Sequence, residues 1–169
     1  DLLEFPWGCA EQVASRLLPL SLIYPNLPAD APRLREMSQA LSTQRLRLVQ
    51  MAGPEASFGW WGPMTANSAW LTAYAYYADW HASKALRLTL PAEHWRQAMN
   101  AYSKYAKDEP LALRTLAVWF MAERELPVGN LAEGLLQEAA KLSSDPGSPK
   151  SGSLWLGERS ASTDALTLV

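Results

Sequence analysis

Trp60-Trp61-Gly62, followed by Leu71-Thr72, is the stretch that decides the fold, because the same pattern returns 95 residues later. The second copy is Trp155-Leu156-Gly157 followed by Leu166-Thr167, and halfway between them Arg114-Thr115-Leu116-Ala117 resembles Leu71-Thr72-Ala73. Repeated helical hairpins bury an apolar face only against their neighbours, as an open solenoid or a closed ring. Together with a helical pattern almost throughout, the repeat predicts an all-α fold built from such hairpins.

Apolar spacing and helix breakers predict seven helices and no convincing strand. The first predicted helix begins at the turn of residues 9–12, and Pro19 kinks or ends it. The second is capped by Asp30 and ends before Gly53-Pro54, and the third spans residues 67–85. The remaining four run from Pro91 to about Lys107, from after Asp108 to before Pro127, from a cap on Asn130 to near Ser143, and from near Ser162. In the second helix the arginines are expected to point mostly outward. Helices three, five and seven are the predicted equivalents.

Composition narrows the functional classes. Hydrophobic residues make up 49% of the 169 residues, so the chain can bury a real core and is not disordered. The net charge of −2 is spread over both signs, which argues against nucleic acid or an anionic membrane surface as partner. No apolar run is long enough to cross a bilayer. The chain is expected to be a piece of a longer protein.

The chemistry is concentrated in Gly8-Cys9-Ala10-Glu11-Gln12, which holds the only cysteine. A lone thiol can be an inert apolar filler, a nucleophile, or half of a side-chain thioester, and only the thioester makes Gln12 necessary. A cysteine and a glutamine three positions apart near a helix start can bring their side chains together. Loss of ammonia would then close a ring in which Gln12 supplies the electrophilic carbonyl and Cys9 the leaving sulfur.

Such a ring reacts with water unless apolar groups shield it. Phe5 and Trp7, just upstream, are the candidate shielding groups, and Pro6 and Gly8 suit a tight approach of the chain.

The sequence Phe5-Pro6-Trp7-Gly8-Cys9-Ala10-Glu11-Gln12, with Ala14-Ser15-Arg16 after it, resembles the thioester region of the alpha-2-macroglobulin and complement family. It is most similar to bacterial alpha-2-macroglobulins. A second block agrees: Phe58-Gly59-Trp60-Trp61 leading into Ala69-Trp70-Leu71-Thr72-Ala73-Tyr74. The resemblance implies that residues 1–169 are a partial thioester domain, with the α/α toroid of the family as an incomplete ring.

The resemblance implies a protease trap that acts once, and not a turnover enzyme. Cleavage elsewhere in the parent protein would expose the thioester, and a lysine amine of the attacking protease would add to the Gln12 carbonyl. The implied partners are target proteases and the parent domains that cover the thioester, and no cofactor is implied. The implied location is periplasmic or extracellular, with the inner membrane as a candidate anchor for the parent.

Two departures from the family pattern shape the expected reactivity. Bacterial members commonly carry tyrosine where this chain has Phe5, so a hydroxyl contact to the thioester is missing. Complement members that prefer hydroxyl targets use a histidine before the helix equivalent to the one near Ser162, and no histidine follows His94 here. We therefore expect slow, uncatalysed transfer that favours amines.

Two other classes of function stay open. A cysteine hydrolase or transglutaminase would need His81 or His94 within hydrogen-bond reach of Cys9. A helical toroid with a purely binding or structural role would leave Cys9 and Gln12 unreacted. Glu11 could orient the ring or act as a local acid, or it could simply favour the start of the helix. A metal site is not expected, because there is one cysteine and no His-x-x-x-His spacing.

Overall fold

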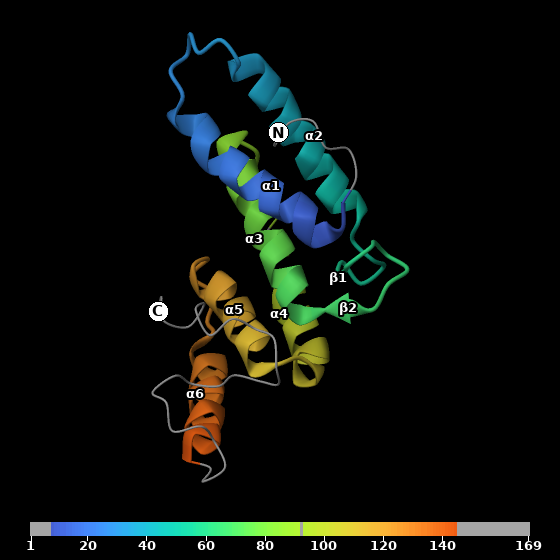
Figure 1. Cartoon of the computed structure of the whole chain (residues 1–169), viewed down its shortest axis with the longest axis vertical. Coiled ribbons are helices and arrows are strands. Elements are labelled where there is room, and N and C mark those ends of the chain that lie inside the picture. Colours follow the sequence, from blue (N-terminus) through green and yellow to red (C-terminus); the bar gives the residue numbers. More distant parts are fainter. Residues whose placement is uncertain (1–7, 92, 145–169) are drawn as a thin grey trace.

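The computed structural model describes residues 8–91 and 93–144. This part of the chain is helical with one very short hairpin of strands, and the predicted all-α class is confirmed (Figure 1). The elements in chain order are α1 (Ala10–Ile23), a 3₁₀ turn (Tyr24–Asn26), α2 (Leu34–Gln50), β1 (Phe58–Gly59), β2 (Asn67–Ser68), α3 (Ala69–Ala85), α4 (Arg96–Tyr105), a second 3₁₀ turn (Ala106–Asp108), α5 (Leu111–Ala122) and α6 (Gly129–Ser144).

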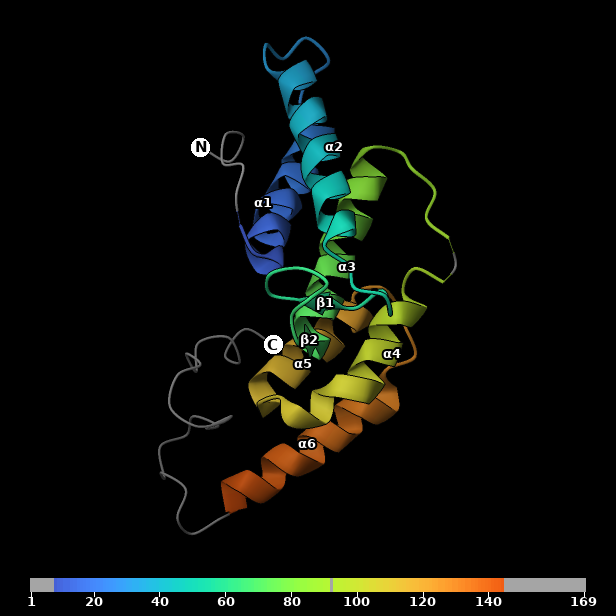
Figure 2. The ribbon, with the colours of Figure 1, turned by 90° about the vertical axis from the view of Figure 1, so that its right-hand side faces the viewer.

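The odd-numbered helices pack side by side. Helix α1 lies against α3, α3 lies against α5, and each of the three also packs against the even-numbered helix that follows it (Figures 1 and 2). This is the arrangement that repeated hairpins predict. The last copy of the repeat, at residues 155–157 and 166–167, and the helix expected near Ser162 lie outside the described residues.

Small side chains let α1 approach α3 closely. Ala10 and Ala14 on α1 are fully buried, as are Ala69, Ala73 and Ala78 on α3. Larger apolar groups fill the space around them, among them the fully buried side chains of Leu17, Leu41, Leu48, Leu71 and Met121. Burying a leucine or methionine stabilises the fold by roughly 1.5–3 kcal/mol, so this shared core fixes the position of α1.

The strand hairpin is attached to α3 by Thr72. Its side-chain oxygen accepts a hydrogen bond from the Phe58 N–H at 2.9 Å and donates one to the Ser68 carbonyl at 2.6 Å. Gly59 is required because a Cβ there would lie 2.7 Å from the Ala66 oxygen and 2.9 Å from that of Thr65. No strand was predicted here, since two residues are too short to show alternation.

Two expected helix boundaries near α1 and α2 differ from the structure. Pro19 was expected to kink or end the first helix, and it does not end it, because the helix continues to Ile23. It removes one backbone donor, while the buried Leu17 and Leu20 on either side keep the helix packed. Asp30 does not cap the second helix, which begins at Leu34 after a turn in which the Leu34 N–H donates to the Ala31 carbonyl.

Two other helix starts also differ from prediction. Helix α4 begins at Arg96 and not at Pro91, because Pro91 opens a turn that its carbonyl closes with the His94 N–H. Helix α6 begins at Gly129, so Asn130 lies in its first turn and is not its cap. The predicted third and fifth helices agree with α3 and α5 to within two residues at their starts. None of the described helices is both long and apolar enough to cross a bilayer.

Candidate functional site

Cys9 and Gln12 contact each other at the first turn of α1. Cys9 is the N-cap residue and has an extended backbone, with φ −71° and ψ 171°. The two residues form a capping box, in which the Cys9 side chain faces the Gln12 N–H and Gln12 Oε1 accepts from the Cys9 N–H at 3.1 Å. A capping box satisfies two backbone donors that a helix start otherwise leaves unpaired. The predicted pair therefore also serves as the cap.

Gly8 makes room for this contact. A Cβ at position 8 would lie 3.0 Å from Gln12 Oε1 and 3.2 Å from Gln12 Cβ, closer than such groups normally pack. A larger residue at position 8 would require the Gln12 side chain to shift by a few tenths of an ångström. The glycine of the motif is therefore explained by close approach.

The two side chains differ in exposure. Cys9 is 5% exposed, whereas Gln12 is exposed to solvent in this chain. In a bond between them, the sulfur would lie on the protein side and the acyl carbon on the outer side. Ala10, between them, is fully buried.

The loop at Trp60 holds the start of α1 in place. The Trp60 carbonyl accepts a hydrogen bond from the Ala10 N–H at 2.8 Å. The centroid of the Trp60 ring lies 5.9 Å from that of Trp70. The Trp70 ring stacks on Tyr74 at 6.0 Å, and the Tyr74 ring stacks on Phe120 at 5.1 Å. The second sequence block thus lies directly beside the Cys9–Gln12 pair, and an aromatic row links it to α5.

Glu11 belongs to a chain of three hydrogen-bonded side chains. Ser15 Oγ donates to Glu11 Oε1 at 3.0 Å and lies 3.0 Å from the Tyr74 hydroxyl. Because a serine has one hydroxyl proton, the Tyr74 hydroxyl must donate to Ser15. Burial raises the pKa of Tyr74, against the opposing effect of the Ser15 hydrogen bond and with a contribution from the Glu11 charge, so it stays a donor near neutral pH. The chain joins α1 to α3.

Sequence reasoning missed part of this site. Ser15 and Tyr74 were noted only within motifs, although the four-residue spacing from Glu11 to Ser15 was visible. The bond to the Trp60 carbonyl carries no side-chain signal. Phe5 and Trp7, the predicted shielding groups, lie outside the described residues.

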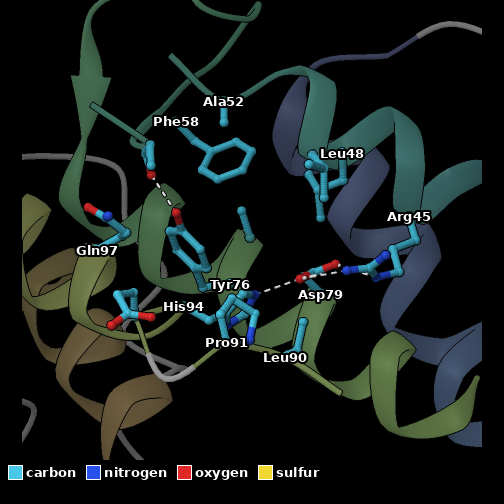
Figure 3. Close-up of a pocket in the computed structure, with 14 residues that line it drawn as sticks. Arg45, Leu48, Ala52, Phe58, Tyr76, Asp79, Leu90, Pro91, His94 and Gln97 are labelled. Carbon is cyan, nitrogen blue, oxygen red and sulfur yellow. Dashed lines mark hydrogen bonds and ion pairs between the residues drawn. The ribbon is translucent and has the colours of Figure 1, made fainter. Parts of the chain in front are cut away.

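The two histidines lie in other surroundings. His94 Nε2 is 2.6 Å from Asp79 Oδ2, and Asp79 also pairs with Arg45 at 2.8 Å, although the arginines of α2 were expected to point mostly outward. These three residues line a cavity of about 360 Å³ between α2, α3 and α4 (Figure 3). His81 lies edge-on to Tyr77, and its buried Nε2 has no hydrogen-bond partner within residues 8–91 and 93–144. Neither histidine is hydrogen-bonded to Cys9.

Among the described residues, no group of three or more His, Cys, Asp or Glu side chains is placed to hold a metal ion.

The sequence is similar to a curated protein. It is 46% identical over 154 residues to the alpha-2-macroglobulin of Ralstonia nicotianae, a match that covers 86% of this chain. The chain belongs to the alpha-2-macroglobulin family. It spans about a tenth of the length of that relative. No family model matches the chain.

Solved alpha-2-macroglobulins share the fold. The C-terminal part of native Escherichia coli alpha-2-macroglobulin superimposes with a TM-score of 0.61 at 22% identity, covering 82% of this chain and 24% of that one. Salmonella alpha-2-macroglobulin reacted with methylamine gives 0.62 at 22% identity, covering 83% and 10%. At this identity the likeness concerns the fold alone.

Proposed function

We propose that residues 1–169 are part of the thioester domain of a protease-trapping alpha-2-macroglobulin, in which Cys9 and Gln12 form the reactive bond. The observation that carries this proposal is the capping box, which holds each of the two side chains against the backbone of the other residue, beside Gly8. Family membership supports an inhibitor role, and the Salmonella relative was solved after reaction with methylamine, a small amine.

The contacts at the start of α1 suit acyl transfer. Formation of the ring joins Cys9 Sγ to Gln12 Cδ with loss of ammonia. An amine would then attack Cδ, the new C–N bond would replace the C–S bond, and the thiol of Cys9 would be released. Negative charge would develop on the Gln12 oxygen, which already accepts a hydrogen bond from the Cys9 N–H at 3.1 Å. Donors placed in advance on such an oxygen lower the barrier.

The proposed partners are target proteases, captured through lysine amines, and the parent domains that cover the site. Gln12 is exposed here, and beside it the loop carries Trp61, 71% exposed, and Met64, 95% exposed. In this proposal, these exposed apolar side chains face a domain of the parent, since contiguous exposed apolar surface is typical of interaction sites. The proposed location of the parent is periplasmic or extracellular.

A cysteine–histidine enzyme is less well supported. His94 is engaged with Asp79, and His81 is packed against Tyr77. A base must reach the thiol to activate it, and neither ring does so. A helical module that only binds remains the alternative that experiment must separate.

The test is methylamine treatment of the full-length protein. We expect the native protein to weigh less than its sequence by one ammonia and to release one thiol on treatment, whereas Cys9→Ser and Gln12→Ala lose both signals. Gln50→Ala, an exposed glutamine at the end of α2, is the matched control and should behave as wild type. Native protein that shows neither the mass loss nor a released thiol would contradict the proposal.

A further inference from the structure

The hydrogen-bond chain from Tyr74 through Ser15 ends on the carboxylate next to the proposed acyl carbon. Glu11 directly precedes Gln12, is half-buried, and has Oε1 held by Ser15 at 3.0 Å. Tyr74 is fixed in turn by stacking between Trp70 and Phe120. The side chains that position Glu11 therefore come from three helices, α1, α3 and α5. An acid that only favours the start of a helix needs no such contacts with other helices.

The carboxylate of Glu11 has no cationic partner in the part of the chain that the structure describes. No lysine, arginine or histidine lies within ion-pair distance of it, whereas Glu36, Glu55, Glu93 and Glu138 each have one. Its two supporting groups are neutral hydroxyls. Among the described residues, its negative charge is therefore oriented by a hydroxyl and has no ion-pair partner.

We propose that Glu11, held by Ser15 and Tyr74, is the docking group that brings a cationic amine to the Gln12 carbonyl and so selects lysine over neutral nucleophiles. This inference rests on the proposed thioester. It assigns the amine preference to residues of α1 and α3.

The steps balance as follows. The ammonium group pairs with the Glu11 carboxylate and loses one proton to solvent, which leaves a neutral amine beside Gln12 Cδ. The amine nitrogen forms the C–N bond, the C–S bond breaks, and the thiolate of Cys9 takes the proton that the nitrogen gives up. The products are an amide at position 12, the Cys9 thiol and one proton in solution.

Arg16 is a second charged residue near Gln12. Its Nη1 lies 3.7 Å from the point where a Gly8 Cβ would stand, one helical turn after Gln12. Glu11 and Ser15 lie on the side of α1 that meets Tyr74, so the two charges flank Gln12.

The test compares a charged with an uncharged nucleophile on the full-length protein. Methylamine is protonated near neutral pH, whereas hydroxylamine is mostly uncharged, and thiol release reports both reactions. The variants are Glu11→Gln, Ser15→Ala and Tyr74→Phe. Glu36→Gln, a solvent-exposed acid on α2, is the control. Intact mass verifies that each variant has lost ammonia before the rates are compared.

We expect Glu11→Gln to slow methylamine about fivefold, the effect of one unit charge about 4 Å away in water, and to leave hydroxylamine within about twofold. Ser15→Ala and Tyr74→Phe should also lower the ratio of the methylamine rate to the hydroxylamine rate, but by a smaller factor than Glu11→Gln. Glu36→Gln should leave this ratio unchanged. Added salt should slow methylamine in the wild type more than in Glu11→Gln.

If Glu11→Gln slows both nucleophiles equally, or slows neither, this inference is wrong, but the proposed thioester is not affected. If Glu11→Gln does not form the ring, the rate ratios of Ser15→Ala and Tyr74→Phe decide. A wild type without ammonia loss and without thiol release would instead refute the proposed function, and this inference with it.

Discussion

At the scale of single residues, Gly8 has the clearest physical requirement. Its backbone needs no unusual angle, but a Cβ would lie 3.0 Å from Gln12 Oε1. The glycine therefore serves the Gln12 side chain and not the local backbone. This separates its effect on chemistry from its effect on stability.

We predict that Gly8→Ala leaves the full-length protein folded, with a change in unfolding free energy below about 1 kcal/mol, but reduces the fraction that has lost ammonia. The matched control is Gly134→Ala in α6, where a Cβ would meet nothing within 4 Å. Intact mass and thermal unfolding report the two effects. A normal ammonia loss in Gly8→Ala would contradict the assigned role.

His81 gives a prediction about pH. Burial, with a smaller contribution from Lys84, lowers its pKa, so the folded state favours the neutral ring. The stability it contributes is present above the unfolded-state pKa of about 6.5 and is lost as pH falls through the lower folded-state value. His81→Phe keeps a ring against Tyr77 and cannot be protonated.

As pH falls from about 7.5 to about 5.5, the wild type should lose stability that His81→Phe keeps. We therefore expect the unfolding free energy of His81→Phe, relative to that of wild type, to rise over this range. Urea unfolding of the domain at both pH values measures this difference. A constant difference would show that His81 does not titrate differently in the folded and unfolded states.

At the scale of elements, α3 depends on an acid distant in sequence. Glu109 Oε1 accepts from Ser68 Oγ at 2.5 Å and from the Ala69 N–H at 2.8 Å, and Oε2 accepts from the Trp70 N–H at 3.2 Å. One carboxylate thus satisfies two backbone donors and the Ser68 hydroxyl at the start of α3, and its charge suits that end of the helix. It ties the turn before α5 to the helix that packs against α1.

We predict that Glu109→Ala destabilises the domain by about 1–2 kcal/mol, with Glu109→Gln intermediate. Glu93→Gln, which removes a surface ion pair with Arg96, should cost less than about 1 kcal/mol. Equilibrium unfolding of each variant gives the values. Equal effects at both positions would mean that the Glu109 contacts add little.

At the scale of the whole molecule, the described residues form a row of hairpins, and the proposed reactive site lies at its exposed end. Helices α1, α3 and α5 lie side by side, and α3 contacts both neighbours. Gln12 lies at the exposed start of α1, next to a loop with exposed Trp61 and Met64. Protection of the proposed bond must then come from parts of the parent beyond the described residues.

We predict that the excised 1–169 segment loses its thioester to water faster than the native parent. Hydrolysis gives a carboxylate at position 12 and a free Cys9 thiol, so mass and thiol titration follow it in time. Equal lifetimes in segment and parent would show that other domains give no protection.

The sequence by itself determined the helical class, the positions of α3 and α5 and the family, because periodicity and short motifs are local properties of the chain. The motif also predicts the Cys9–Gln12 bond, which stays a proposal. Helix ends were predicted less well. Asp30, Pro91 and Asn130 are good local signals, but turns and long-range partners such as Asp79 for His94 decided where the helices begin.

Only the tertiary structure decided that the Trp60 carbonyl bonds Ala10, that Tyr74 supports Glu11 through Ser15, and that Glu109 caps α3. These contacts join residues roughly 40–60 positions apart, as for Ser15 and Tyr74 or Ala69 and Glu109. Their formation depends on how α1, α3 and α5 pack. No local pattern encodes that packing, because it is set by shape and burial across the whole core.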